Sequence, residues 1–113
     1  MLQSPEPVTQ AEGAASGMRQ LTGVNLRHLQ TFVAIARHGV MKEAAEHLCC
    51  SLSTVSATQA ALERSVGSVL LVRTARGWVP TVAGAKALIA AEAVLAAAAA
   101  FLVATQGFGD TGL

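Results

Sequence analysis

Few side chains in this sequence of 113 residues could act as nucleophiles or as metal ligands. His47 and Cys50 are three positions apart and could approach one another near the end of a helix. A nucleophilic cysteine also needs an activating base held by a third group, and a pocket for its substrate. The sequence indicates neither, and the three histidines and two cysteines do not have the spacing of a zinc site. We therefore expect no catalytic residue, no metal and no cofactor, and the chain is not predicted to be an enzyme.

Basic side chains are the other chemically useful group, and they are concentrated in the middle of the chain. From Asn25 to Lys86 there are seven basic and three acidic residues, a net charge of +4, although the whole chain carries only +1. A mildly basic body is compatible with binding to nucleic acid. Because hydrophobic residues make up 52% of the chain and charged residues 13%, this is not a charge-rich disordered protein.

The cysteines and the first residues indicate the compartment of the protein. Cys49 and Cys50 are neighbours, which could form a disulfide with each other only under strain. We expect free thiols in a reducing, cytoplasmic compartment. Residues 1–17 contain proline, glycine and glutamate and lack the apolar run of a secretory signal. We predict a disordered N-terminal tail over residues 1–24.

Apolar residues at helical spacing predict three short helices in the first half of the chain. The first spans about 25–37 and ends at Gly39, and the second spans about 42–48. The third begins after a serine cap, Ser51 or Ser53, and runs to about Val66. The residues expected to face inward are Leu26, Leu29, Phe32, Val33 and Ala36 in the first helix, Ala44, Ala45 and Leu48 in the second, and Val55, Gln59, Leu62 and Val66 in the third.

A hairpin and a long helix are predicted to follow. Residues 70–81 hold two short β-prone runs, with Arg73 at the base of the hairpin and Arg76 at its tip. Trp78 is expected to fill the core beneath it. A fourth helix should cover about 82–106, before a flexible C-terminal tail over residues 107–113. This order predicts a mainly α fold: a winged helix-turn-helix over residues 25–81, with three helices and a two-stranded wing, and an added C-terminal linker helix.

Leucines recur every seven residues along the last predicted helix, at Leu88, Leu95 and Leu102, with small alanines between them. This pattern is typical of close contact between two helices, so we predict that these leucines form a dimerisation surface. The alternative is that the stripe folds back onto its own domain. A membrane span over 87–104 is not expected, because Glu92 interrupts the stretch and no basic residue follows it to fix an orientation.

Several segments occur in an order and spacing that resemble a known family. They are NLRHLQTFVAIARHG, AAEHL, SLSTVS, ALE and RTARG, followed by the Ala83–Gly84 pair. Over about Asn25 to Leu88 they resemble the N-terminal DNA-binding domain of LysR-type transcriptional regulators. The resemblance implies a winged helix-turn-helix, a linker helix through which two chains dimerise, and binding to double-stranded promoter DNA. An effector-binding domain normally follows in this family. We expect this chain to lack it and to bind no small-molecule effector.

The resemblance also implies which residues meet DNA. The third helix would enter the major groove with its N-terminal residues, and the hairpin arginines would reach phosphate or the minor groove. Helix capping is the alternative role for the hydroxyl groups, and an ion pair with Glu63 is the alternative for Arg73. The residues predicted to contact DNA are Ser51, Ser53, Thr54, Ser56, Arg73 and Arg76.

Five positions depart from the family pattern. Leu52 stands where a polar residue, often glutamine, is usual. Ala57 stands where a basic residue is usual, and Ala60 stands near the place of another. Gln59 replaces an aliphatic residue, and Lys42 replaces a small hydroxyl cap of the second helix. These changes predict weakened DNA binding. The rival interpretation is a protein-interaction module that pairs through its last helix, with a second copy or a related regulator, and binds little DNA. A third interpretation is that the chain is a truncated, inactive remnant.

Overall fold

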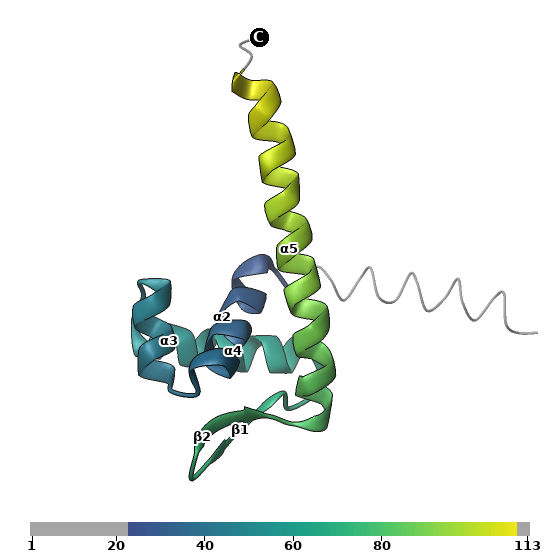
Figure 1. Cartoon of the computed structure of the whole chain (residues 1–113). Helices are drawn as coiled ribbons and strands as arrows, with labels where there is room; N and C mark the ends of the chain where they lie inside the picture. The colour runs from purple at the N-terminus through teal and green to yellow at the C-terminus, as the bar shows by residue number, and fades with distance from the viewer. Residues whose placement is uncertain (1–22, 111–113) are drawn as a thin grey trace, which may run out of the picture.

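The computed structural model describes residues 23–110, with side chains described through residue 106. Its elements are, in chain order, α2 (Leu26–His38), α3 (Met41–Leu48), α4 (Leu52–Val66), β1 (Leu71–Thr74), β2 (Gly77–Pro80) and α5 (Val82–Asp110). Three short helices, a hairpin and a long helix therefore follow one another as predicted (Figure 1). Most of the predicted N-terminal tail, residues 1–22, lies outside the described residues. The domain itself begins before Asn25, because Val24 packs against the core and the Gly23 carbonyl accepts a hydrogen bond from Ser65.

Helix α2 is the centre of the domain, since it contacts α3, α4 and α5. The Asn25 side chain accepts from the His28 amide at 3.0 Å, and His28 Nδ1 accepts from the Asn25 amide at 3.3 Å, a reciprocal cap of the kind that fixes a helix start. Phe32 and Ile35 are fully buried, whereas Leu26 is 47% exposed. Leu29, Val33 and Ala36 pack against the core as predicted, and the prediction is wrong only for Leu26. Neighbours on several sides bury a broad surface of α2, and its first residue lies beyond that surface.

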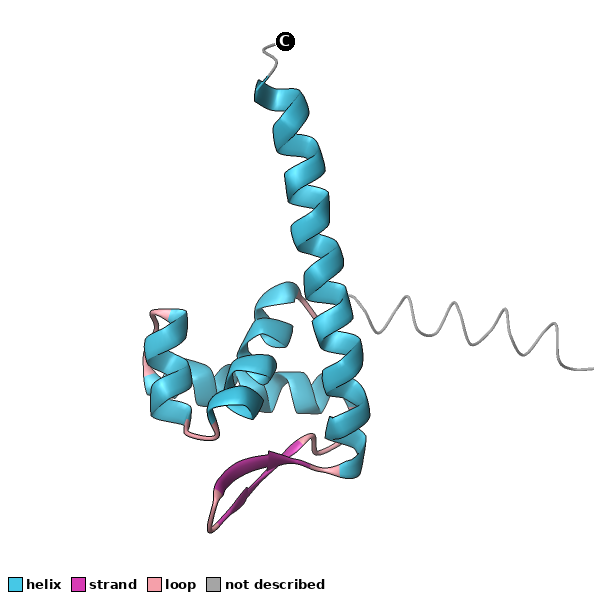
Figure 2. Ribbon diagram, in the orientation of Figure 1, coloured by secondary structure: helices cyan, strands magenta, loops and turns pink. Residues whose placement is uncertain are grey.

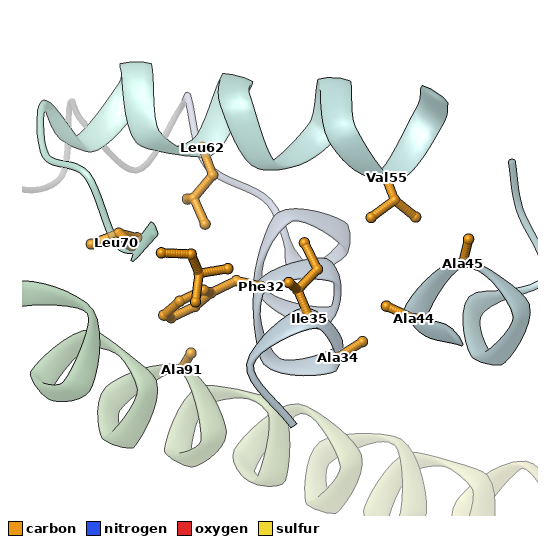
Figure 3. Packing of buried hydrophobic residues seen from close by; sticks show 10 residues of the cluster. Phe32, Ala34, Ile35, Ala44, Ala45, Val55, Leu62, Leu70 and Ala91 are labelled. Atoms are coloured by element: carbon orange, nitrogen blue, oxygen red, sulfur yellow. The ribbon is translucent and has the colours of Figure 1, made fainter. Parts of the chain in front are cut away.

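The core lies where α2, α4 and the first half of α5 meet (Figure 3). Val55 and Leu62 on α4 pack there as predicted, together with Leu70 and Ala91. On α3, a pair of buried alanines lets that helix approach closely, also as predicted. Val66 is 42% exposed, so the prediction that it faces the core is wrong. It is the last residue of α4, and the core beneath the helix ends one turn earlier, at Leu62.

Strands β1 and β2 form an antiparallel hairpin, drawn in magenta in Figure 2, with Thr74 opposite Gly77 and Leu71 opposite Pro80. The Glu63 carboxylate accepts from the backbone amides of Leu70, at 2.7 Å, and Leu71, at 3.1 Å, which ties the start of β1 to α4. At the turn, Thr74 Oγ1 donates to the Gly77 carbonyl and accepts from the Arg76 amide. The hairpin is thus held at its base by a carboxylate and at its tip by a hydroxyl.

Two glycines allow the hairpin to lie against the helices. Gly77 has φ 106°, and a Cβ there would lie 2.5 Å from the Gly39 carbonyl oxygen. Next to this contact, the Trp78 amide donates to the same carbonyl at 2.8 Å. Gly84, in the first turn of α5, is buried, and a Cβ there would lie 1.9 Å from the Leu70 carbonyl oxygen. The wing is therefore fixed by backbone contacts that only glycine permits.

Helix α5 starts against the domain and then extends away from it (Figure 1). Ala91 is buried against the core and Leu88 is partly buried against it, whereas the side chains from residue 99 to residue 106 are exposed. The helix continues to Asp110, so residues 107–110, predicted as part of a flexible tail, are helical. Single glycines cost only about 1 kcal/mol in a helix, which a helix of 29 residues tolerates near its end. Residues 111–113 lie outside the described residues.

Candidate nucleic-acid interface

The start of α4 is built around the Ser51 hydroxyl. Ser51 is the N-cap residue, and its Oγ accepts from the Thr54 amide at 3.1 Å, which confirms the predicted capping role. The same Oγ donates to Thr54 Oγ1 at 2.8 Å and pairs with Ser53 Oγ at 3.1 Å. Since a hydroxyl has one hydrogen, Ser53 is the donor in the last pair. The Thr54 hydroxyl hydrogen is therefore left for an acceptor outside the domain, and Ser53 and Thr54 are both exposed.

A groove of about 460 Å³ lies between the start of α3, the start of α4 and the hairpin. Ser56 and Arg73, two of the predicted DNA-contacting residues, both line it. Lys42 and Leu52 contribute from α3 and α4, and Trp78 lines it from β2. The structure thus brings the serine-lined end of α4 and the hairpin residues next to the turn to one face of the molecule.

The arginines of the hairpin are exposed and lie at different heights on it. Arg76 is in the turn between the strands, as predicted. Arg73 is in β1 opposite Trp78, one residue pair from the turn, so the prediction that it lies at the base of the hairpin is wrong. The alternative role for Arg73, an ion pair with Glu63, is wrong, because the Glu63 carboxylate instead accepts from the amides at the start of β1. Trp78 is partly buried against the core, as predicted, although it also lines the groove.

Ion pairs account for few of the cationic groups within residues 23–106. Arg37 pairs with Glu92, and His38 Nδ1 lies 3.8 Å from the Glu43 carboxylate. In the same part of the chain, the structure shows no ion pair for the exposed side chains of Lys42, Arg73 and Arg76. These three cations, two of which line the groove, are therefore available to phosphate.

Sequence reasoning missed the Arg37–Glu92 pair, which joins the end of α2 to α5. The two residues are 55 positions apart. No local pattern indicates a contact over such a separation, and only the crossing of α2 and α5 brings them together.

The positions that depart from the family pattern fall in two places. Leu52 is 51% exposed at the edge of the groove, and Ala57 is exposed on the same helix. Gln59 is only 4% exposed, as predicted. Its Nε2 donates to the Glu63 carboxylate at 3.3 Å, while its buried Oε1 has no partner among the described residues. The predicted cap position at Lys42 is wrong, because the N-cap of α3 is Val40, which has no hydroxyl to offer.

The three leucines predicted to form a dimer surface have different environments. Leu88 packs against the core of its own domain, so the alternative of folding back holds there. Leu95 is partly buried and lines a shallow cavity with residues of α2 and α3, whereas Leu102 is 55% exposed. Of the three leucines, Leu102 is the one that its own domain leaves exposed.

Residues 26–85 match the sequence profile of the bacterial regulatory helix-turn-helix proteins of the lysR family. The chain belongs to this LysR family. Among its curated relatives, it is 42% identical over 82 residues to the probable hydrogen peroxide-inducible genes activator of Mycobacterium avium, which is 73% of this chain and 26% of the relative. This LysR-type chain thus spans about a quarter of the length of that regulator.

Solved structures of LysR-type proteins have the same fold. The Corynebacterium glutamicum OxyR C206 mutant superposes with a TM-score of 0.71 and 37% identity, over 74% of this chain and 27% of that one. The DNA-binding domain of CbnR, solved in a complex with DNA, superposes with a TM-score of 0.70 and 32% identity, over 76% of this chain and 99% of that one. The described residues therefore form a LysR-type winged helix-turn-helix DNA-binding domain.

Proposed function

We propose that this LysR-type domain binds double-stranded promoter DNA with the start of α4 in the major groove and the wing against the phosphate backbone. The observation that carries the proposal is the groove in which Lys42, Ser56 and Arg73 meet. The start of α4 and the arginine-bearing hairpin lie on one face there, and the DNA-binding domain of CbnR, which has a similar fold, was solved in a complex with DNA. A helix N-terminus presented to DNA also attracts phosphate through its free N–H groups.

Affinity in this arrangement comes mainly from three cations, Lys42, Arg73 and Arg76. Between residues 51 and 60 the recognition helix has no basic side chain. Each neutralised phosphate contributes about −0.9 to the slope of log affinity against log salt concentration. We therefore expect a slope of about −3 for each bound domain if all three cations reach phosphate.

A salt titration of binding to random duplex DNA tests this proposal, with Arg76→Ala and Arg76→Lys as the variants. Arg76→Ala should weaken binding to all duplexes alike and make the slope less negative by roughly 1. Arg76→Lys is the matched control, because lysine keeps the charge and also binds phosphate, so the slope should persist. Absence of binding by the unmodified domain at low salt would overturn the proposal, and an unchanged slope in Arg76→Ala would remove Arg76 from the interface.

The exposed distal part of α5 favours a second role, pairing with another chain. Large apolar side chains are exposed there, at Phe101, Leu102 and Val103. We propose that α5 pairs with a second copy of this chain or with a related regulator, so that two recognition helices can address two half-sites. Should DNA binding be absent, this pairing would remain as the function of an interaction module.

A membrane is the other environment that an exposed apolar helix could enter. By length and composition, Val82–Gln106 is able to cross one. The first half of this stretch is held by the domain, because Ala91 is buried and Glu92 pairs with Arg37. The remaining 14 residues would reach only about 21 Å, less than the hydrocarbon thickness of about 30 Å. A protein partner in the cytoplasm, where Cys49 and Cys50 stay free, therefore fits α5 better than a membrane.

A further inference from the structure

Leu52 is a large apolar side chain at the point where α4 would enter DNA. It is the first residue of α4, is 51% exposed, and lines the groove together with Lys42, Ser56 and Arg73. A leucine in this place contributes nothing to the core, whose residues on α4 are Val55 and Leu62. It exposes apolar surface beside two cations that are available to phosphate.

The rest of the exposed surface of α4 itself, from residue 52 to residue 60, has no side chain that reads a base with two hydrogen bonds. Its members are hydroxyl-bearing or apolar, and the long amide of Gln59 is buried instead. Arginine, lysine, asparagine and glutamine are the side chains that recognise guanine or adenine through paired hydrogen bonds. The exposed residues from 52 to 60 are Leu52, Ser53, Thr54, Ser56, Ala57 and Ala60.

The feature of the major groove that suits an apolar side chain is the methyl group on C5 of thymine. We propose that Leu52 determines specificity by contacting the C5 methyl group of a pyrimidine in the binding site. Thymine carries this methyl group in an A·T pair, and 5-methylcytosine carries the same group in a G·C pair. The proposal rests on the DNA binding proposed above and adds which base feature the domain selects.

Replacing thymine by uracil removes the methyl group and leaves every hydrogen-bonding group of the base in place. The experiment first selects the duplex with the highest affinity from a random pool, and then measures binding to copies in which each thymine in turn is uracil. At the contacted position, uracil should weaken binding by the unmodified domain about fourfold, the value expected for one buried carbon. A cytosine placed there should bind better when it is 5-methylated.

Leu52→Ala should abolish the difference between thymine and uracil while keeping the salt dependence of binding. Leu26→Ala is the matched control, because Leu26 is also the first residue of its helix and is 47% exposed, but it does not line the groove. The Leu26→Ala variant should keep the full difference in affinity between the thymine and uracil duplexes. Leu52→Gln offers an amide that pairs with adenine, so this variant should prefer A·T to G·C at the position and yet ignore the thymine methyl group.

Three results would overturn the proposal. One is equal binding of the unmodified domain to the thymine and uracil duplexes at every position. Another is a Leu52→Ala variant that still distinguishes them, since the methyl group would then meet another residue. In both cases the salt-dependent binding to random DNA would persist, so the proposed function would stand. The third result is the absence of binding to any duplex, which would overturn the proposed function as well as the proposed role of Leu52.

Discussion

At the scale of single residues, Gln59 is the side chain least suited to its surroundings. It is 4% exposed on a face of α4 whose other buried members are Val55 and Leu62. Its Nε2 group has an acceptor in the Glu63 carboxylate, and this fixes the amide so that Oε1 is buried without a donor from the described residues. A buried acceptor that lacks a hydrogen bond costs about 1–3 kcal/mol.

Gln59→Leu should therefore raise the free energy of unfolding by about 1–2 kcal/mol. Glu63 keeps its two bonds to the amides of Leu70 and Leu71, so the attachment of the hairpin should survive the change. Urea denaturation followed by circular dichroism measures the effect. Gln30→Leu makes the same chemical change at an exposed position of α2 and should alter stability by less than about 0.5 kcal/mol. A loss of stability in Gln59→Leu would mean that the bond from Nε2 to Glu63 outweighs the orphaned oxygen.

At the scale of elements, the position of the wing depends on the close approach of α5 to the strand before it. Gly84 is helical, so substitution by alanine would by itself favour the helix by up to about 1 kcal/mol. A Cβ at this position, however, would lie 1.9 Å from the Leu70 carbonyl oxygen, a backbone atom. The collision can be relieved only by moving α5 or β1, and the Leu70 carbonyl also accepts from the Thr81 amide.

Gly84→Ala should destabilise the domain by about 1–3 kcal/mol, the usual cost of overpacking, and should weaken DNA binding because the wing shifts. Thermal unfolding and the salt titration described above measure the two effects. Gly67→Ala provides the comparison, because Gly67 has φ 75° but nothing within 4 Å of its Cβ position. It should cost about 1 kcal/mol through backbone strain alone and leave the wing in place. A DNA affinity of Gly84→Ala equal to that of the unmodified domain would show that the wing tolerates displacement.

At the scale of the whole molecule, local signals predicted the order of elements and the ends of α2 and α4, but not the end of α5. Gly39 adopts the left-handed conformation expected of a glycine that ends a helix, and helical spacing correctly placed Gln59 inside. Errors arose where burial depends on the reach of neighbouring elements, as at Leu26 and Val66. The bonds from Glu63 to the start of β1 are long-range consequences of assembly. Neither composition nor periodicity could have indicated them.

The face of α5 that lies on the domain continues beyond it without a partner among the described residues. Ala91 is buried and Leu95 partly buried on this face, and Leu102, seven residues further on, is 55% exposed. A second chain that covered Leu102 would complete the stripe predicted from the heptad spacing. Because Leu88 already packs against its own core, a test of pairing must use the distal end, where a substitution leaves the fold intact.

Leu102→Asp should raise the dissociation constant of a pair of chains by at least roughly tenfold, because a carboxylate buried without a partner costs more than about 1.4 kcal/mol. Sedimentation equilibrium at several concentrations measures it. Ala100→Asp is the matched control, since it adds the same charge to an exposed position of the helix about 200° around from Leu102. It should leave the association unchanged. An unmodified chain that stays monomeric, or a Leu102→Asp variant that associates as before, would contradict pairing through this face, and half-site recognition would then need another surface.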